Sequence, residues 1–293
     1  MIKINSLSHR LGAKTVLCDV DLTVNDGSIV GIVGINGAGK STLLRLLSGV
    51  YIPDGGSVSY DGAPPTDPKV RQDIFFLPDD PYYTSSSTPQ SLFELYHSFY
   101  PNADRDEFNR ILSLYGINNK EKMRNFSKGM RRQTFIALAL AIRPKYLLLD
   151  EAFDGLDPLA RKVFKEHIGQ MAEQSGTSVI ISSHSLRELE DFCDTFALID
   201  KNTVRSHGDI ASHVERLCKF ELAFTSPVPK ELFDSIPQCT ASIRGKFVTV
   251  VMEGDPEQCQ TVLLGLHPAI IEQMPLDFEE AFIHDVNKNR GDI

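Results

Sequence analysis

The residues with the clearest chemical potential form a glycine-rich stretch near the N-terminus. It reads Gly34-Ile35-Asn36-Gly37-Ala38-Gly39-Lys40-Ser41, fits the pattern G-x-x-x-x-G-K-[ST], and is followed by Thr42. Glycines let the backbone curl until successive N–H groups point at phosphate oxygens, and a helix that begins there faces the anion with its positive end. We therefore expect this stretch to hold a nucleotide, with Lys40 on the β- and γ-phosphates and the Ser41 hydroxyl on Mg²⁺.

A pair of carboxylates, Asp150 and Glu151, directly follows the apolar run Tyr146 to Leu149. At the carboxyl end of a parallel strand this pair would open toward the phosphate-binding crevice. Asp150 suits the Mg²⁺ shell, and Glu151 could act as general base on an attacking water. An apolar strand that ends in Asp-Glu is common by itself, so the functional interpretation depends on the phosphate loop.

These side chains require strands and helices that position them, and the first two thirds of the chain supplies both in alternation. Apolar runs predict strands at 29–33, 58–61, 73–77, 146–149, 178–182 and 196–199. Helical spacing and end signals predict helices at 41–47, 92–100, 105–115 and 128–142, and two more that begin at Pro158 and Ser185. This alternation predicts an α/β fold with a mostly parallel sheet covered on both faces.

The pattern changes near residues 208–219. Beyond that point 220–225, 241–251 and 270–274 look like strands, and 256–264 looks like a helix. We expect a first domain over 1–215 and a small C-terminal α+β domain over 216–293.

Composition excludes several classes of protein. The 293 residues include 30 Lys plus Arg against 39 Asp plus Glu, a net charge of −9, which disfavours sequence-independent binding of nucleic acid. The five cysteines are far apart and form no CxxC pair, so neither a disulfide framework nor a zinc site is indicated. No apolar run reaches the ~20 residues of a membrane span and no signal core is visible, which favours a cytoplasmic location.

Three further segments resemble those of the ABC (ATP-binding cassette) ATPases. Asn125-Phe126-Ser127-Lys128-Gly129-Met130 is similar to the signature L-S-G-G-Q, with matches at Ser127 and Gly129. Phe153 to Asp157 resembles the D-loop, and His184 follows a strand where the family has its switch histidine. The resemblance covers about residues 2–215. It implies a P-loop NTPase core of the ABC type with a helical subdomain at about 80–142.

The resemblance also implies a mechanism and partners. ATP and Mg²⁺ would be bound between two ATPase subunits, identical or different, that face each other head to tail. The Gly34–Thr42 loop of one subunit would face Ser127, Gly129 and Asp157 of the other. Lys40, Glu151 and His184 would be catalytic, and Ser41 and Asp150 would hold the metal.

The chain is most similar to ATPases of ABC-2-type exporters, including bacitracin and lantibiotic systems. The similarity rests on Phe-Leu-Pro-Asp at 76–79, on the form of the signature, and on the segment 276–282, for which a terminal amphipathic helix is the alternative. A separate membrane subunit would then hold the chain at the inner face of the cell membrane. The transported substrate and the homo- or heterodimeric state stay open.

Two positions depart from the family's pattern. Asp79 stands where the Q-loop has glutamine; we expect it to bind Mg²⁺ or water, although its charge would repel the γ-phosphate without the metal. Leu11 falls at the place of the aromatic residue that stacks on adenine, so adenine would rest on Leu11, His9 or Arg10. This pattern predicts weak discrimination between ATP and GTP.

Two other functions compete with transport. A soluble ABC ATPase that acts as a mechanical switch would carry the same motifs, although such proteins usually have two cassettes, long coiled coils or zinc hooks. A small-molecule P-loop kinase is disfavoured, because a signature lies between Lys40 and Asp150.

Overall fold

The computed structural model describes residues 1–288 and divides into two compact units at His207 and Gly208. The expected boundary lay between residues 215 and 216. The difference is helix α8 (Ile210–Glu215), which belongs to the second unit. There His213 of α8 lies 3.3 Å from the Asp285 carboxylate on α11 (Phe278–Lys288). Each unit is described by itself below.

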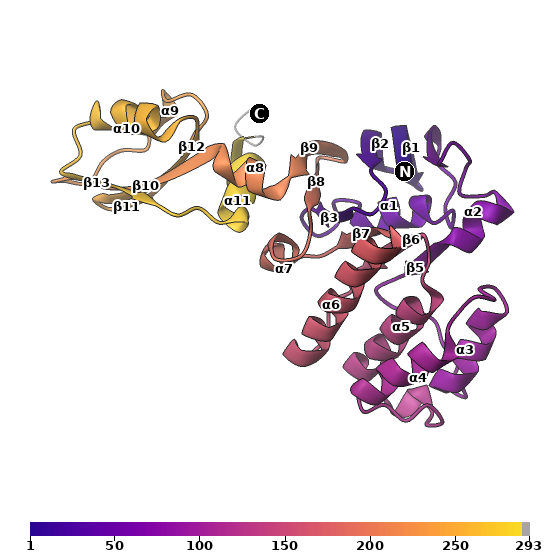
Figure 1. The fold of residues 1–293 in the computed structure, drawn as a ribbon. Helices are drawn as coiled ribbons and strands as arrows, with labels where there is room; N and C mark the ends of the chain where they lie inside the picture. The colour runs from indigo at the N-terminus through magenta and orange to yellow at the C-terminus, as the bar shows by residue number, and fades with distance from the viewer. Residues whose placement is uncertain (289–293) are drawn as a thin grey trace. The chain divides into compact units, whose positions relative to one another are not determined.

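The first unit is built around a six-stranded sheet (Figure 1). Its order is β5 (Ile74–Leu77), β6 (Tyr146–Asp150), β7 (Ser178–Ser182), β3 (Ile29–Val33), β8 (Thr195–Asp200) and β9 (Thr203–Asp209). The pairs β3–β7, β3–β8, β5–β6 and β6–β7 are parallel, and every residue of β3, β6 and β7 is buried. Parallel strands buried on both faces read as continuous apolar runs, which is why the sequence reveals them. Their carboxyl ends share one edge of the sheet.

A second sheet is antiparallel, with the order β2 (Lys14–Val24), β1 (Ile2–Leu11) and β4 (Gly55–Tyr60). The sequence predicts only part of β4 and neither of the other two strands. Helix α1 (Lys40–Leu47) shares a hydrophobic core with both sheets, and its four leucines are fully buried. This packing fixes the start of α1 at the edge of the parallel sheet.

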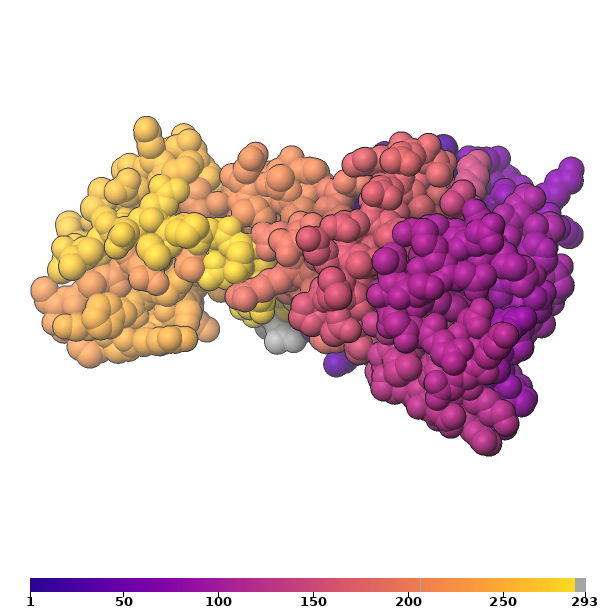
Figure 2. Space-filling model, turned by 60° about the horizontal axis from the view of Figure 1, so that its bottom comes forward, coloured from indigo at the N-terminus to yellow at the C-terminus, as the bar shows by residue number. Residues whose placement is uncertain are grey.

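Helices α3 (Pro89–His97), α4 (Arg105–Leu114) and α5 (Lys128–Ile142) form the helical subdomain, a block that projects from the sheet (Figures 1 and 2). Residues Thr134 to Ile142 of α5 are all buried, so α5 is the central helix of this block. The remaining helical segments of this unit are α2 (Pro68–Asp73), a 3₁₀ turn (Met123–Asn125), α6 (Pro158–Ser175) and α7 (Leu186–Glu190). Within residues 1–288, no helix combines the length and the apolar character that crossing a bilayer requires.

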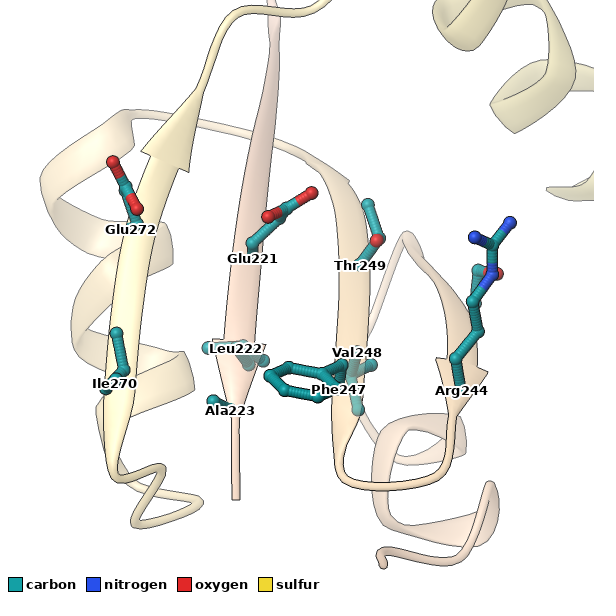
Figure 3. Close-up of a pocket in the computed structure, with 10 residues that line it drawn as sticks. Glu221, Leu222, Ala223, Arg244, Phe247, Val248, Thr249, Ile270 and Glu272 are labelled. Carbon is teal, nitrogen blue, oxygen red and sulfur yellow. The ribbon is translucent and has the colours of Figure 1, made fainter.

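The second unit is a four-stranded antiparallel sheet with helices. The sheet order is β11 (Cys239–Arg244), β12 (Phe247–Glu253), β10 (Leu217–Ala223) and β13 (Ile270–Met274), with α9 (Glu231–Asp234) and α10 (Pro256–Leu264) besides α8 and α11. The stretch 241–251, expected as one strand-like segment, is instead a hairpin that turns at Gly245, where φ is +65°. Alternate residues such as Phe220 and Val250 enter a core, whereas Glu221 and Thr249 lie on the opposite face (Figure 3).

Candidate nucleotide-binding site

The glycine-rich loop connects β3 to α1, and two of its glycines stand where no side chain fits. A Cβ on Gly34 would lie 2.6 Å from the carbonyl oxygen of Ile199. A Cβ on Gly39 would lie 2.9 Å from Leu17 Cδ2, and Gly39 has φ +114°, which other residues rarely adopt. Gly37, with φ +81°, faces open space. The loop is therefore drawn tightly against β8 and β2, with its tip exposed at Asn36.

The start of α1 suits an anion. Helix α1 has no side-chain cap, so no side chain occupies the free N–H groups of its first turn. Lys40 is buried, and its ammonium donates to the carbonyl oxygen of Gly34 at 2.8 Å. Ala38 and Thr42 are buried beside it. A cationic group inside a curl of backbone at a helix N-terminus is the arrangement that binds phosphate.

Asp150, at the end of β6, is 1% exposed and accepts two hydroxyl hydrogen bonds on one oxygen. Ser41 Oγ donates to Asp150 Oδ1 at 3.1 Å, and Ser182 Oγ donates to the same atom at 2.7 Å. A hydroxyl and a carboxylate oxygen are hard ligands of the kind that Mg²⁺ prefers. The two predicted metal ligands, Ser41 and Asp150, are thus brought together, and the donor set fits the ion.

Glu151 follows Asp150 in a left-handed conformation, with φ +48°. Its backbone N–H donates to Ser182 Oγ at 3.0 Å, which holds it against the end of β7. Its carboxylate accepts from the backbone N–H of His184 at 3.1 Å and shares a 2.9 Å hydrogen bond with His184 Nδ1. Its other oxygen lies 3.8 Å from Lys40 Nζ. The three side chains expected to be catalytic therefore form one cluster.

The imidazole of His184 is 57% exposed, whereas the Glu151 side chain is 17% exposed. The hydrogen bond from Glu151 raises the pKa of His184 above its ordinary value, and the charges of Glu151, Asp154 and Glu188 act in the same direction. Partial burial opposes them. The contact therefore favours the imidazolium form of His184.

The signature-like segment and the D-loop-like segment lie against each other. Ser127 caps α5 by accepting from the Met130 N–H at 3.1 Å, as its position before the helix predicts. A Cβ on Gly129 would lie 2.5 Å from the carbonyl oxygen of Gly155, so only glycine fits there. Asp157 caps α6 through the Ala160 N–H at 2.9 Å. One chain thus presents Ser127 and Gly129 at a helix start beside the D-loop.

Asp79 has a partner that sequence reasoning missed. Sequence reasoning placed Asp79 among the metal ligands, but its carboxylate accepts from the guanidinium of Arg132 at 2.9 Å. The hydrogen bond occupies Oδ1 of a side chain that is 51% exposed, so a role of Asp79 as a metal ligand stays a prediction. Arg132 is the fifth residue after Ser127 in the sequence. A charged residue inside a helix is usually solvated, and the burial of this one depends on where α5 packs.

The residues expected near adenine differ in availability. His9 is buried, stacks on Tyr51 with ring centroids 5.5 Å apart, and has Nδ1 3.3 Å from the Asp54 carboxylate. Leu11 is 45% exposed, and Arg10 is exposed beside it at the β1–β2 turn. Of the three candidates, His9 is therefore already engaged by its own neighbours.

Comparisons with known proteins agree with this geometry. A family model described as ABC transporter matches residues 17–154. The ABC transporter ATP-binding protein YtrB of Bacillus subtilis (strain 168) is 32% identical over 287 residues, 97% of this chain and 97% of that protein. The lantibiotic transport ATP-binding protein SrtF of Streptococcus pyogenes is 28% identical and covers 76% of this chain and 98% of that protein. A solved structure described as a dimeric, post-hydrolysis state of the ATP-binding cassette MJ0796 bound to ADP and Pi has a TM-score of 0.63 at 22% identity, over 71% of this chain and 98% of that chain.

The fold and the site define an ABC-type ATPase. The likeness to YtrB over nearly the whole chain shows that this protein belongs to the ABC transporter ATP-binding proteins. The α/β cassette fold and the ATPase class, both expected from the motifs, are confirmed. The roles of individual site residues rest on the geometry above and are argued next.

Proposed function

We propose that this protein is the ATP-hydrolysing subunit of an ABC exporter, working as a head-to-tail dimer that drives a separate membrane subunit. The observation that carries the proposal is the cluster in which Lys40, Asp150, Glu151 and His184 meet at the end of the phosphate-type loop. Such a cluster can hold a triphosphate, a metal and a water in one place.

The chain's own groups suggest a division of labour during hydrolysis. The N–H groups of the loop and the Lys40 ammonium would grip the phosphates of ATP. Ser41 and Asp150 would hold Mg²⁺, which spreads the charge of the transferring phosphoryl group when it is bound. Glu151 would orient and deprotonate the attacking water. His184 would place an N–H near the γ-phosphate.

Two contacts within this cluster compete with the phosphates of ATP for the same groups. The Glu151 carboxylate is held by His184, and Lys40 Nζ is spent on the carbonyl of Gly34. A triphosphate in the loop would offer Lys40 and His184 a more highly charged acceptor than a carbonyl or a carboxylate. ATP binding would then free Glu151 to take a water, which links substrate binding to activation of the base.

We propose a dimer because Ser127 and Gly129 suit a phosphate that the resemblance places on another subunit. They form a helix start whose serine and N–H groups suit an anion, and the resemblance to the family assigns that anion to a second subunit. The dimeric form of the MJ0796 cassette supports this arrangement. Because the γ-phosphate would bridge two chains, closure would be lost on hydrolysis.

Export and a location at the inner face of the membrane are proposed from the kind of relative. SrtF is by its name a lantibiotic transport ATP-binding protein, and the Phe-Leu-Pro-Asp and signature-like segments of this chain resemble those of exporter ATPases. This chain would only provide the free energy of ATP hydrolysis. A partner subunit that crosses the membrane would bind the transported substrate.

Affinity purification from membranes tests the proposal. We expect a polytopic membrane protein to copurify with the tagged chain, and the complex to release phosphate from ATP only with Mg²⁺. The Lys40→Ala variant should abolish release while the membrane protein still copurifies. Recovery with soluble partners alone would contradict transport and favour a mechanical switch.

A further inference from the structure

Arg132 is a buried cation at the centre of three chain segments. Its side chain, on the second turn of α5, is 2% exposed. The guanidinium donates to the Pro78 carbonyl oxygen and to the Asp79 carboxylate, each at 2.9 Å. It also donates to the Glu151 carbonyl oxygen at 2.9 Å and reaches the Asp150 carbonyl oxygen at 3.4 Å. One planar fork thus joins α5 to the ends of β5 and β6.

Electrostatics couples Arg132 to Asp79. Burial lowers the pKa of Arg132, and the charge and hydrogen bond of Asp79 oppose that shift together with Asp154 and Asp150. Asp79 is the carboxylate in direct contact. A buried cation that loses its anion is destabilised. The aspartate in place of the Q-loop glutamine is therefore explained by the cation that it neutralises.

Arg132 contacts the backbone of Glu151 and not its carboxylate, through the hydrogen bond to the carbonyl oxygen. Glu151 has φ +48°, a conformation that non-glycine residues hold only under restraint. Ser182 Oγ fixes its N–H and Arg132 fixes its carbonyl, so the backbone is held on both sides of its Cα. These two contacts set the direction in which the carboxylate leaves the chain.

We propose that Arg132 is a positioning residue for hydrolysis, which orients the Glu151 carboxylate and is itself held in place by Asp79. The proposal rests on the hydrolytic role proposed above for Glu151. Because Ser127 caps α5, a shift of this helix on contact with a second subunit would move the Arg132 guanidinium and with it Glu151. Asp79 and Arg132 thus link the signature-like segment to the catalytic end of β6.

The test compares Arg132→Gln with Arg131→Gln in the full-length chain. Arg131, the neighbouring residue, donates to the carbonyl oxygens of Met123 and Arg124, and its guanidinium lies over the Tyr83 ring. It therefore controls for loss of a helix arginine without loss of the Glu151 contact. For Arg132→Gln we expect kcat to fall on the order of 10- to 100-fold, with KM for ATP changed less than about twofold, because the phosphate loop is untouched. Equal kcat in the two variants, or a matching rise in KM, would overturn the proposal.

A double-variant cycle tests the pair itself. Asp79→Gln alone leaves the cation unpaired and should lower the melting temperature, whereas Asp79→Gln with Arg132→Gln should recover most of that loss. Additive changes in melting temperature would refute the coupling. This readout does not require that each variant be active enough for the ATPase assay. Wild-type protein that fails to hydrolyse ATP would instead refute the proposed function and leave the melting cycle interpretable.

Discussion

Glu151 lies where two kinds of restraint meet. Its backbone is fixed by Ser182 and Arg132, while its carboxylate is held by His184. A base in an enzyme must be both aimed and releasable. In the role proposed for Glu151 as the base, the backbone contacts would set the direction of its carboxylate, and its release would depend on the exposed His184, which a phosphate could draw away.

The His184 contact has a measurable signature in the resting protein. Glu151→Gln removes the charge that raises the pKa of His184 and weakens the hydrogen bond, so this pKa should fall toward the ordinary value near 6.5. NMR titration of the histidines measures the shift, and the other seven histidines serve as internal controls. A His184 pKa unchanged by the substitution would show that the contact is absent in solution.

The raised pKa of His184 also makes stability depend on pH. The contact contributes its full stabilisation below the pKa that His184 has in the unfolded chain, and this stabilisation is lost as the pH rises through the pKa of the folded protein.

Nucleotide selectivity is also set at the residue scale. His9 is occupied by Tyr51 and Asp54, which leaves the exposed Leu11 and Arg10 for a base. Neither side chain offers the paired donor and acceptor that distinguish adenine from guanine. We expect the dissociation constants for ATP and GTP, measured by calorimetry, to agree within about tenfold, or about 1.4 kcal/mol. A much stronger preference for ATP would require another contact to the base.

At the scale of elements, the start of α5 packs closely against the D-loop-like segment because residue 129 is a glycine. Gly129→Ala would push a Cβ to 2.5 Å from the Gly155 carbonyl oxygen, and neither backbone can yield cheaply. We expect a loss of roughly 1–3 kcal/mol of stability, together with reduced ATPase activity. Gly169→Ala in α6 is the control, because a Cβ there meets nothing within 4 Å and alanine favours helix. Urea unfolding that ranks the two variants equally would contradict this packing.

The sheet of the second unit carries an unfavourable pair. Glu221 and Glu272 lie directly opposite each other on β10 and β13, on the face shown in Figure 3. Like charges at such positions repel, whereas opposite charges attract. Glu272→Lys should therefore stabilise the protein by a few tenths to about 1 kcal/mol, and less in high salt. Glu272→Gln, which only removes the repulsion, should give a smaller gain. Destabilisation by the lysine variant at low salt would count against the register.

The sequence predicts the parts of the first unit that are buried on both faces, and less of the rest. Strands β3, β6 and β7 are continuous apolar runs. Strand β1 was missed because its alternation is broken by irregular pairing around Ser6, which has φ +45°. The hairpin in the second unit was merged into one segment because Gly245 alone marks its turn.

The candidate site, too, contains residues that local sequence predicts and residues that depend on packing between distant segments. Lys40, Ser41 and Asp150 were found because their spacing is fixed by a loop and a strand end. Arg132 and its contact with Asp79 were missed, because their pairing depends on how the helix block packs on the sheet. A contact between segments that lie 53 residues apart leaves no periodic signal in the sequence.

At the scale of the whole molecule, one chain would be only half of the proposed working unit. Its two halves would be the Gly34–Thr42 loop of one subunit and the Ser127 end of α5 of another. ATP would act as the bridge. Both halves exist in a single chain, so a homodimer can satisfy the requirement, and a related second subunit would satisfy it equally.

The most direct measurement is the mass of the Glu151→Gln protein by light scattering, with ATP and Mg²⁺ present. Loss of the base should slow hydrolysis strongly, so ATP should accumulate between subunits and double the mass. Adding Ser127→Arg should return the mass to that of one chain, since the second half of the site is blocked. A Glu151→Gln protein that hydrolyses ATP at the normal rate, or that binds ATP and stays monomeric both alone and with any ATPase subunit that copurifies with it, would contradict the account.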